Sequence, residues 1–218
     1  KYFRQEHVHY RRETSGEEMA LINYTSGTTG FSKGVMIPYR AMWSNCDFAK
    51  SVLGSTVKAG DSVISILPMA HMYGMSFEFF FEFLHGCHIY YLTRVPSPAI
   101  IAQAFSEVKP AIIIAVPLVI EKIIRKKVFP KIQNSRMRLL LNMPVLNRKV
   151  NQKICEQVKN AFGGRFYEII IGGAAFNQEV EQFLKRIDFP YTVGYGATEC
   201  APIICYADYH DFVPGSCG

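Results

Sequence analysis

Residues 24–36 read Tyr-Thr-Ser-Gly-Thr-Thr-Gly-Phe-Ser-Lys-Gly-Val-Met, and the rest of the chain is organised around this stretch. The apolar run Leu21–Tyr24 predicts a buried strand before it, and Val35–Ile37 predicts another strand after it. Between them, only Ser, Thr and Gly fill the positions from Thr25 to Gly30, and Lys33 then adds a positive charge. Glycines let backbone N–H groups turn toward an anion, and hydroxyls donate further hydrogen bonds. The stretch therefore predicts a phosphate-binding loop.

The groups expected to hold phosphates are the backbone amides and hydroxyls of the loop and its lysine ammonium: Thr25, Ser26, Gly27, Thr28, Thr29, Gly30 and Lys33. A Walker loop needs Gly directly before the lysine and Ser or Thr directly after it. Here Ser32 precedes Lys33 and Gly34 follows it, so the Walker pattern does not fit. A flexible Ser/Gly linker is the other alternative, and the lysine and strand that follow at once disfavour it.

The composition is that of a globular protein, with 218 residues, 49% hydrophobic and 19% charged. Much of the net charge of +6 comes from one basic cluster: Lys122, Arg125, Lys126, Lys127, Lys131, Arg136 and Arg138. This cluster could be a solvated helix face, or it could meet an anionic membrane or the phosphates of a ligand. Nothing resembles a nucleic-acid recognition helix or an aromatic RNA platform, so nucleic acid is not expected as a partner.

The cysteines and apolar runs indicate the compartment. Six cysteines lack a C-x-x-C pair and a nearby metal-ligating His, which favours reduced thiols in the cytoplasm over disulfides or a zinc site. The longest apolar runs, Met72–Leu84 and Ala111–Ile120, are interrupted by Glu or Pro and are shorter than the roughly 20 residues that span a bilayer. The chain starts at Lys1 without a secretory signal pattern, so we expect a piece of a longer protein.

Helical and strand patterns alternate along most of the chain. Helices are predicted from Pro38 to Gly54, over Met75–Leu84, over Pro98–Val108, from Pro117, over Leu146–Phe162 and after a capping Asn177. Strands are predicted at Ser62–Leu67, Cys87–Leu92, Ala111–Val116, Arg165–Ile171 and Tyr191–Gly194. The first helix is expected to cross over between strands, and Met75–Leu84 to be buried on most sides. The alternation predicts an α/β fold of layered, mostly parallel sheets covered by helices, with residues 1–17 as a polar lead-in.

Three further segments follow predicted strands, where ligand crevices form in such folds. The first, Leu67–Gly74, contains His71, although a lone histidine is more often a core residue. The second is the small-residue turn Gly172–Ala174. The third reads Gly-Tyr-Gly-Ala-Thr-Glu over residues 194–199 and would by itself be a turn.

Together and in this order, these segments resemble the signatures of the adenylate-forming superfamily, which includes acyl-CoA synthetases, luciferases and the adenylation domains of peptide synthetases. The family usually has Pro where this chain has Ser32. The resemblance covers roughly Glu18–Gly218 and implies part of the large amino-terminal domain. The start of that domain and a carboxyl-terminal lid domain with a catalytic lysine are expected to be missing, as is the family's Thr-Gly-Asp motif for the ribose.

The resemblance implies a reaction of a carboxylate with ATP and Mg2+ to an acyl-adenylate, followed by transfer to coenzyme A. It implies that Lys33 and the loop hold the departing pyrophosphate, and that Glu199 binds Mg2+. Thr198 and His71 would contact the α-phosphate and the carboxylate, which makes these four the expected catalytic residues. On the adenine side, the implied binding residues are Gly172, Gly173, Ala174, Gly194, Tyr195, Gly196 and Ala197.

One more segment points to the substrate. Lys109–Lys122 is similar to a segment before the acyl tunnel of long-chain fatty acyl-CoA synthetases, which often have an aromatic residue where Ile120 stands. This implies a fatty acid substrate, and the phenylalanines of Met75–Leu84 could wall its pocket or simply form a core helix. An enzyme that adenylates an aryl or amino acid, and a nucleotide-binding relic without catalysis, are the alternatives. A cytoplasmic protein is expected, with peripheral contact to an anionic membrane left open.

Overall fold

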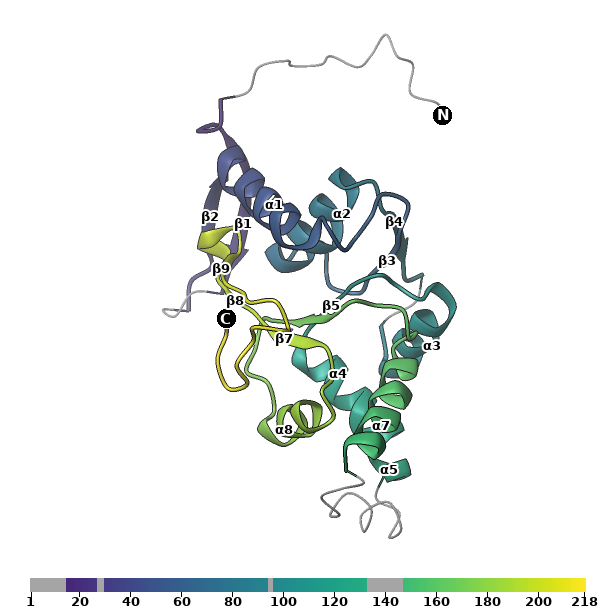
Figure 1. Ribbon diagram of the computed structural model, residues 1–218. Helices are drawn as coiled ribbons and strands as arrows, with labels where there is room; N and C mark the ends of the chain where they lie inside the picture. The colour runs from purple at the N-terminus through teal and green to yellow at the C-terminus, as the bar shows by residue number, and fades with distance from the viewer. Residues whose placement is uncertain (1–14, 27–29, 94–95, 133–146) are drawn as a thin grey trace.

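The computed structural model describes residues 15–26, 30–93, 96–132 and 147–218, which form an α/β fold (Figure 1). Its strands are β1 (Met19–Thr25), β2 (Lys33–Pro38), β3 (Ser62–Ser65), β4 (His88–Tyr91), β5 (Ile113–Ala115), β6 (Ile169–Ile171), β7 (Tyr191–Val193), β8 (Tyr195–Gly196) and β9 (Ile203–Cys205). Strands β3 and β4 pair in parallel, as do β5, β6 and β7 in that order. The predicted α/β class with mostly parallel sheets is therefore confirmed, although the parallel strands are shorter than the apolar runs that predicted them.

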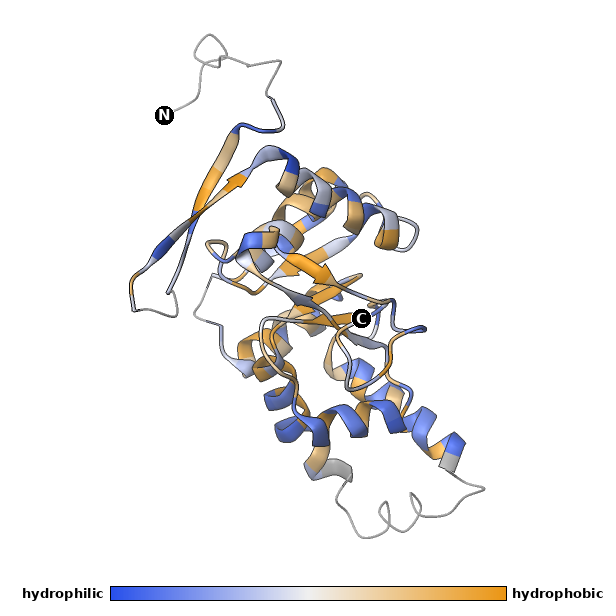
Figure 2. Cartoon of the chain, turned by 90° about the vertical axis from the view of Figure 1, so that its left-hand side faces the viewer, coloured by the Kyte–Doolittle hydropathy of each residue, from blue (hydrophilic) through white to orange (hydrophobic). Residues whose placement is uncertain are grey.

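Strands β1 and β2 form an antiparallel hairpin that stands off from the body of the molecule (Figure 2). Its register pairs Leu21 with Ile37 and Thr25 with Lys33, so the described residues of the predicted loop lie at the hairpin tip. Only a small core supports it, in which the buried Ile37 packs with Met72. The hairpin thus carries the loop away from the parallel sheets.

The helices and helical turns are α1 (Tyr39–Leu53), η2 (Gly74–Phe80), α2 (Phe81–Leu84), α3 (Pro98–Val108), α4 (Pro117–Ile123), η3 (Ile124–Val128), α5 (Phe129–Ile132), α7 (Asn147–Ala161), α8 (Gln178–Arg186) and η4 (Thr198–Cys200). Side-chain caps fix the start of two of them. Ser97 accepts the backbone N–H of Ile100 at the start of α3, and Asn177 accepts that of Val180 at the start of α8, as predicted.

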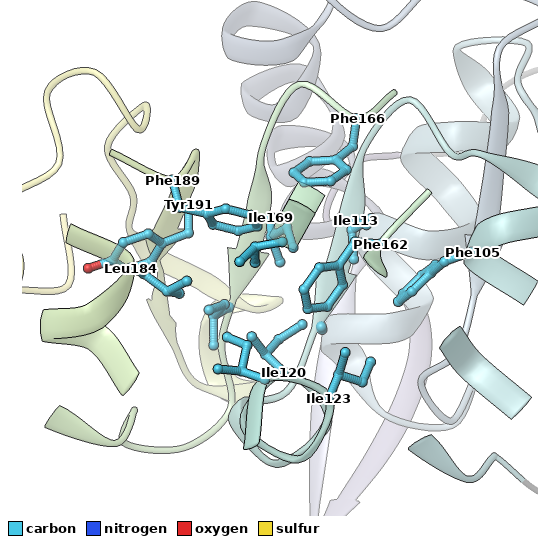
Figure 3. Close-up of a cluster of buried hydrophobic side chains, with 14 of the residues drawn as sticks. Phe105, Ile113, Ile120, Ile123, Phe162, Phe166, Ile169, Leu184, Phe189 and Tyr191 are labelled. Atoms are coloured by element: carbon cyan, nitrogen blue, oxygen red, sulfur yellow. The ribbon is translucent and has the colours of Figure 1, made fainter. Parts of the chain in front are cut away.

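The sheet β5–β6–β7 is covered on both faces because its side chains alternate. Ile113 and Ala115 face the largest core cluster, which is packed beneath α3, α4, α7 and α8 (Figure 3). Ile114 and Ile170 face a second cluster with residues of α1 and η2. Burial of each such large apolar side chain contributes about 1.5–3 kcal/mol. The two clusters hold the carboxyl ends of β6 and β7 in fixed positions, and the candidate site lies there.

Two expectations need correction. Helix α1 connects β2 to β3, but these strands belong to different sheets, so it is not a crossover within one sheet. The segment predicted as an apolar helix buries Glu78 and Glu82 completely, whereas Phe83 is 64% exposed. The physical reason is that Gly74–Phe80 is π-helical, which shifts the side chains relative to a 3.6-residue period.

The buried carboxylate of Glu78 is compensated by donors from the end of β3. The backbone N–H of Leu67 donates to its Oε2 at 2.8 Å, the backbone N–H of Ile66 donates at 3.1 Å, and the Ser65 hydroxyl donates at 3.2 Å. Burial raises the pKa of Glu78 to about 7. Burial, together with the neighbouring Glu78 carboxylate, also raises the pKa of Glu82 well above its usual value.

In the part that the structure describes, the basic cluster lies on an exposed helix face. Lys122, Arg125, Lys126 and Lys127 are exposed on α4 and η3, and Arg125 pairs with Glu179 of α8 at 2.8 Å. The side chain of Lys131 and the residues Arg136 and Arg138 lie outside the described part. Within that part, no helix is both long enough and apolar enough to cross a bilayer.

Candidate active site

The predicted phosphate loop lies at the exposed tip of the β1–β2 hairpin. Thr25 ends β1, Ser26 follows it, and the exposed Lys33 opens β2 directly opposite Thr25. Gly30 adopts φ +82°, with no atom within 4 Å of the place where a Cβ would stand. This is the left-handed backbone that glycine tolerates best. Gly27, Thr28 and Thr29 were predicted as part of the loop and lie outside the described residues.

The segment that contains His71 follows β3 and contacts the hairpin. The side-chain amide of Asn23 donates to the carbonyl oxygen of Ala70 at 2.8 Å, which joins the two. His71 is exposed, so the core alternative for this histidine is wrong. The backbone N–H of Tyr73 donates to its Nδ1 at 3.3 Å, which leaves Nε2 as the nitrogen that can carry a proton and donate to a ligand.

A cavity of about 170 Å³ forms where this segment meets the carboxyl ends of β6 and β7. The predicted site residues in its wall come from three separate segments: His71, Gly172, Gly173, Gly194, Tyr195, Gly196, Ala197 and Thr198. Ala174 and Glu199 follow these wall residues in sequence and are exposed. The structure therefore brings the segments together as predicted, with a pocket between them.

Glycines keep this cavity open because the backbone lines it. A Cβ at Gly196 would lie 2.3 Å from the carbonyl oxygen of Pro202, a distance that no side chain tolerates. A Cβ at Gly172 would lie 3.1 Å from Cζ of Tyr73, and Gly173 adopts φ +86°. The small residues thus let a ligand lie flat against the backbone, while Tyr195 offers a ring that is 54% exposed.

Tyr73 and Asn45 also build the site, and the sequence analysis assigned neither of them a role. The Tyr73 hydroxyl donates to the carbonyl oxygen of Ile170 at 3.0 Å, and burial raises the pKa of this hydroxyl well above its usual value. Asn45 is 5% exposed and bonds the loop after Glu199. A polar residue on the apolar face of the helix after Pro38 was the available signal for Asn45.

The donor set suits a metal ion that arrives with a nucleotide. In the described residues, no three His, Cys, Asp or Glu side chains converge as a ready-made metal site. Mg2+ is usually held by one or two carboxylates together with phosphate oxygens and water. The carboxylate of Glu199, which is exposed and directly follows the cavity-wall residue Thr198 in sequence, fits such a shared coordination.

Comparison with known proteins gives matches over nearly the whole chain. The family model described as AMP-binding enzyme matches residues 3–218. Long-chain-fatty-acid–CoA ligase ACSBG2 of Homo sapiens is 26% identical over 92% of this chain and 33% of its own length. Long-chain-fatty-acid–CoA ligase 4 of Saccharomyces cerevisiae is 27% identical over 93% of this chain and 31% of its own length. The chain thus spans about a third of the curated relatives it matches.

Solved structures share the fold. ATP-bound MatB from Rhodopseudomonas palustris superposes with a TM-score of 0.66 at 21% identity, covering 94% of this chain and 34% of its own. The o-succinylbenzoate coenzyme A synthetase MenE of Bacillus subtilis, in complex with ATP and magnesium ion, gives a TM-score of 0.64 at 19% identity, covering 90% of this chain and 34% of its own. The family model spans the hairpin, the His71 segment and both loops that form the cavity, and this chain therefore belongs to the AMP-binding enzyme family.

Proposed function

We propose that the full-length protein activates a fatty acid with ATP and transfers the acyl group to coenzyme A. In the first step a carboxylate oxygen bonds to the α-phosphorus of ATP and pyrophosphate leaves. In the second step the thiol of coenzyme A attacks the acyl carbon and AMP leaves. The observation that carries the proposal is the cavity between His71, Gly172 and Thr198, which shares the wall residues Tyr73, Ile170 and Ile203 with a small apolar pocket.

At the phosphate end, we propose that positive charge and hydrogen-bond donors of this chain bind the phosphates. Lys33 and the hairpin loop, including Thr25, Ser26 and Gly30, are proposed to hold the β- and γ-phosphates as they depart. Thr198 is proposed to donate to the α-phosphate, and Nε2 of His71 to orient the carboxylate. Such a site accelerates the reaction mainly by positioning the reactants and neutralising charge.

Glu199 is proposed as the protein ligand of Mg2+. Its carboxylate is exposed in the turn η4 and follows Thr198 directly, so metal and α-phosphate would be held by neighbouring residues. When bound, the ion would neutralise charge on the phosphates.

Adenine is proposed to lie between the Tyr195 ring and the turn Gly172–Ala174. The ring is exposed at the cavity wall, and the turn presents backbone without side-chain bulk. Stacking on an aromatic ring and contact with flat backbone suit a planar base.

The rest of the protein is proposed to complete the enzyme. Because this chain spans about a third of its relatives, we propose that residues 18–218 are part of an adenylation domain and that a carboxyl-terminal domain supplies a catalytic lysine. The free cysteines fit a reducing compartment, and we propose a cytoplasmic location.

A pyrophosphate-release assay on the full-length protein tests the function. Carboxylates from C6 to C18, benzoate and amino acids are compared with ATP and Mg2+ present. Release that depends on fatty acids, with acyl-CoA formed when coenzyme A is added, is the expected result. Preference for an aryl or amino acid would show that the protein adenylates that class of acid instead. Absence of pyrophosphate release with every acid would favour a nucleotide-binding relic without catalysis.

A further inference from the structure

A second, apolar pocket shares Tyr73, Ile170 and Ile203 with the wall of the proposed nucleotide cavity. Its other lining residues are Phe48, Ala49, Val52, Leu53, Phe77, Ile114 and Tyr206. The free space is about 20 Å³, little more than one water molecule needs. An acyl chain longer than a carbon or two can therefore enter only if a wall moves.

Most of the walls are held in place. Ile114 and Ile170 are buried in the central sheet, and Leu53 is 2% exposed on α1. The ring of Tyr73 is fixed by its hydrogen bond to the Ile170 carbonyl and by its contact with Gly172. Side chains packed in this way have no space into which they can turn.

The outer wall is different. Phe48 of α1 and Tyr206, which follows β9, are only half-buried, and their rings meet edge to face with centroids 5.9 Å apart. Both rings are partly exposed to solvent, whereas Ile114, Ile170 and Leu53 are buried. This pair is therefore the side from which the pocket can lengthen.

The hydroxyl of Tyr206 is held by a hydrogen bond to a buried carboxylate. Its hydroxyl donates to Oε1 of Glu168 at 2.5 Å, and the backbone N–H of Tyr209 donates to Oε2 at 3.2 Å. Glu168 is fully buried at the amino end of β6, and burial raises its pKa to about 7. Breaking the bond to Tyr206 would leave this carboxylate with fewer partners, so the ring is held shut.

We propose that Tyr206, fastened by Glu168, is the residue that determines acyl chain length in the proposed fatty acid activation. While the Tyr206 hydroxyl is bonded to Glu168, the ring limits the length of the pocket, so that only short apolar groups fit. A long-chain acyl group must turn the ring outward and break the bond to Glu168. The inference rests on the proposed function, because it assigns the pocket to the acyl end of that substrate.

Tyr206→Phe and Glu168→Gln test this in the full-length protein. Tyr206→Phe keeps the ring and removes the bond, and Glu168→Gln keeps an acceptor but removes the charge. We expect the ratio of kcat/KM for C16 over C6 acids to rise in both, on the order of tenfold for Tyr206→Phe, as one charge-assisted hydrogen bond would predict. Tyr206→Ala, which removes the wall itself, should raise it further.

Tyr167→Phe is the matched control. It breaks the neighbouring bond from Tyr167 to Asp208, at 2.7 Å, without touching the pocket, so its chain-length profile should stay that of the wild type. If the wild type uses fatty acids and the profiles of the folded Tyr206 and Glu168 variants are unchanged, this inference alone is overturned. A profile that shifts equally in Tyr167→Phe would also overturn it. A wild-type protein that uses no fatty acid overturns the proposed function as well, so the two failures are distinguishable.

Discussion

The side chain of Asn45 accepts the backbone N–H of Ile203 through Oδ1 at 2.9 Å, across 158 positions in the sequence. Its Nδ2 also donates to the carbonyl oxygen of Cys200 at 3.1 Å. Both partners belong to the segment directly after Thr198 and Glu199. One buried amide on α1 therefore holds the loop that carries Thr198 and Glu199, the proposed α-phosphate and metal ligands.

Replacement of this amide should damage stability and catalysis together. Asn45→Ala leaves the partly buried N–H of Ile203 and the carbonyl of Cys200 without their side-chain partner, which costs on the order of 1 kcal/mol. We expect a lower melting temperature of the full-length protein and a lower kcat for adenylation. Ser44→Ala, one residue away, loses only a hydrogen bond within the same helix and should change neither. Wild-type kcat in Asn45→Ala would mean that the loop keeps its position without the amide.

The metal and phosphate roles should separate in the kinetics. Glu199→Gln should raise the Mg2+ concentration that gives half-maximal adenylation, because the ion loses its proposed protein carboxylate. Lys33→Ala should slow adenylation with little change in the Mg2+ requirement, because it removes only charge near the departing phosphates. Titration of Mg2+ in the pyrophosphate-release assay measures both. An equal shift in the two variants would contradict the assigned roles.

Tyr195 should contribute to nucleotide affinity. Its exposed ring is proposed to stack on adenine, so Tyr195→Ala should weaken ATP binding by about 1–2 kcal/mol. Calorimetry on the full-length protein measures the loss. Tyr90→Ala removes a similarly exposed ring from β4, outside the cavity wall, and serves as the control. Unchanged affinity in Tyr195→Ala would remove this ring from the adenine site.

Stability should depend on pH through Glu78. Burial raises its pKa to about 7 from a usual value near 4.5, so the folded state binds the proton more tightly than the unfolded state. The stabilisation that the protonated Glu78 gives to the folded state is fully present below pH 4.5 and is lost as the pH rises through 7. Glu78→Gln mimics the protonated form, so its melting temperature relative to the wild type should rise from pH 5 to pH 8.5. The exposed Glu107→Gln should show no such trend. A flat difference for Glu78→Gln would contradict the raised pKa.

Local chemistry made part of this structure predictable. The bounds of α3 agree with the prediction because Pro98 suits the first turn and Ser97 caps it. The loops at Gly172 and Gly194 meet because consecutive parallel strands end at one edge of a sheet, a rule that needs no knowledge of contacts.

What could not be predicted depends on distant partners. The side chain of Glu78 is buried because its segment is π-helical and because donors at the end of β3 bind its carboxylate. A search for α-helical periodicity, at 3.6 residues per turn, detects neither feature. The bond between Asn23 and Ala70, which joins the hairpin to the His71 segment, links two separate elements. Likewise, nothing local indicated that β2 and β3 would belong to different sheets.

The close approach of Gly172 to Tyr73 ties the evolution of the two positions together. A Cβ at position 172 would lie only 3.1 Å from Cζ of the ring, so a larger residue there is accommodated best when position 73 carries a smaller one. Enlargement at position 172 alone is therefore unfavourable. A paired exchange, however, would move bulk from one side of the boundary between cavity and pocket to the other. Directed evolution toward acids of another shape should therefore randomise these two positions jointly.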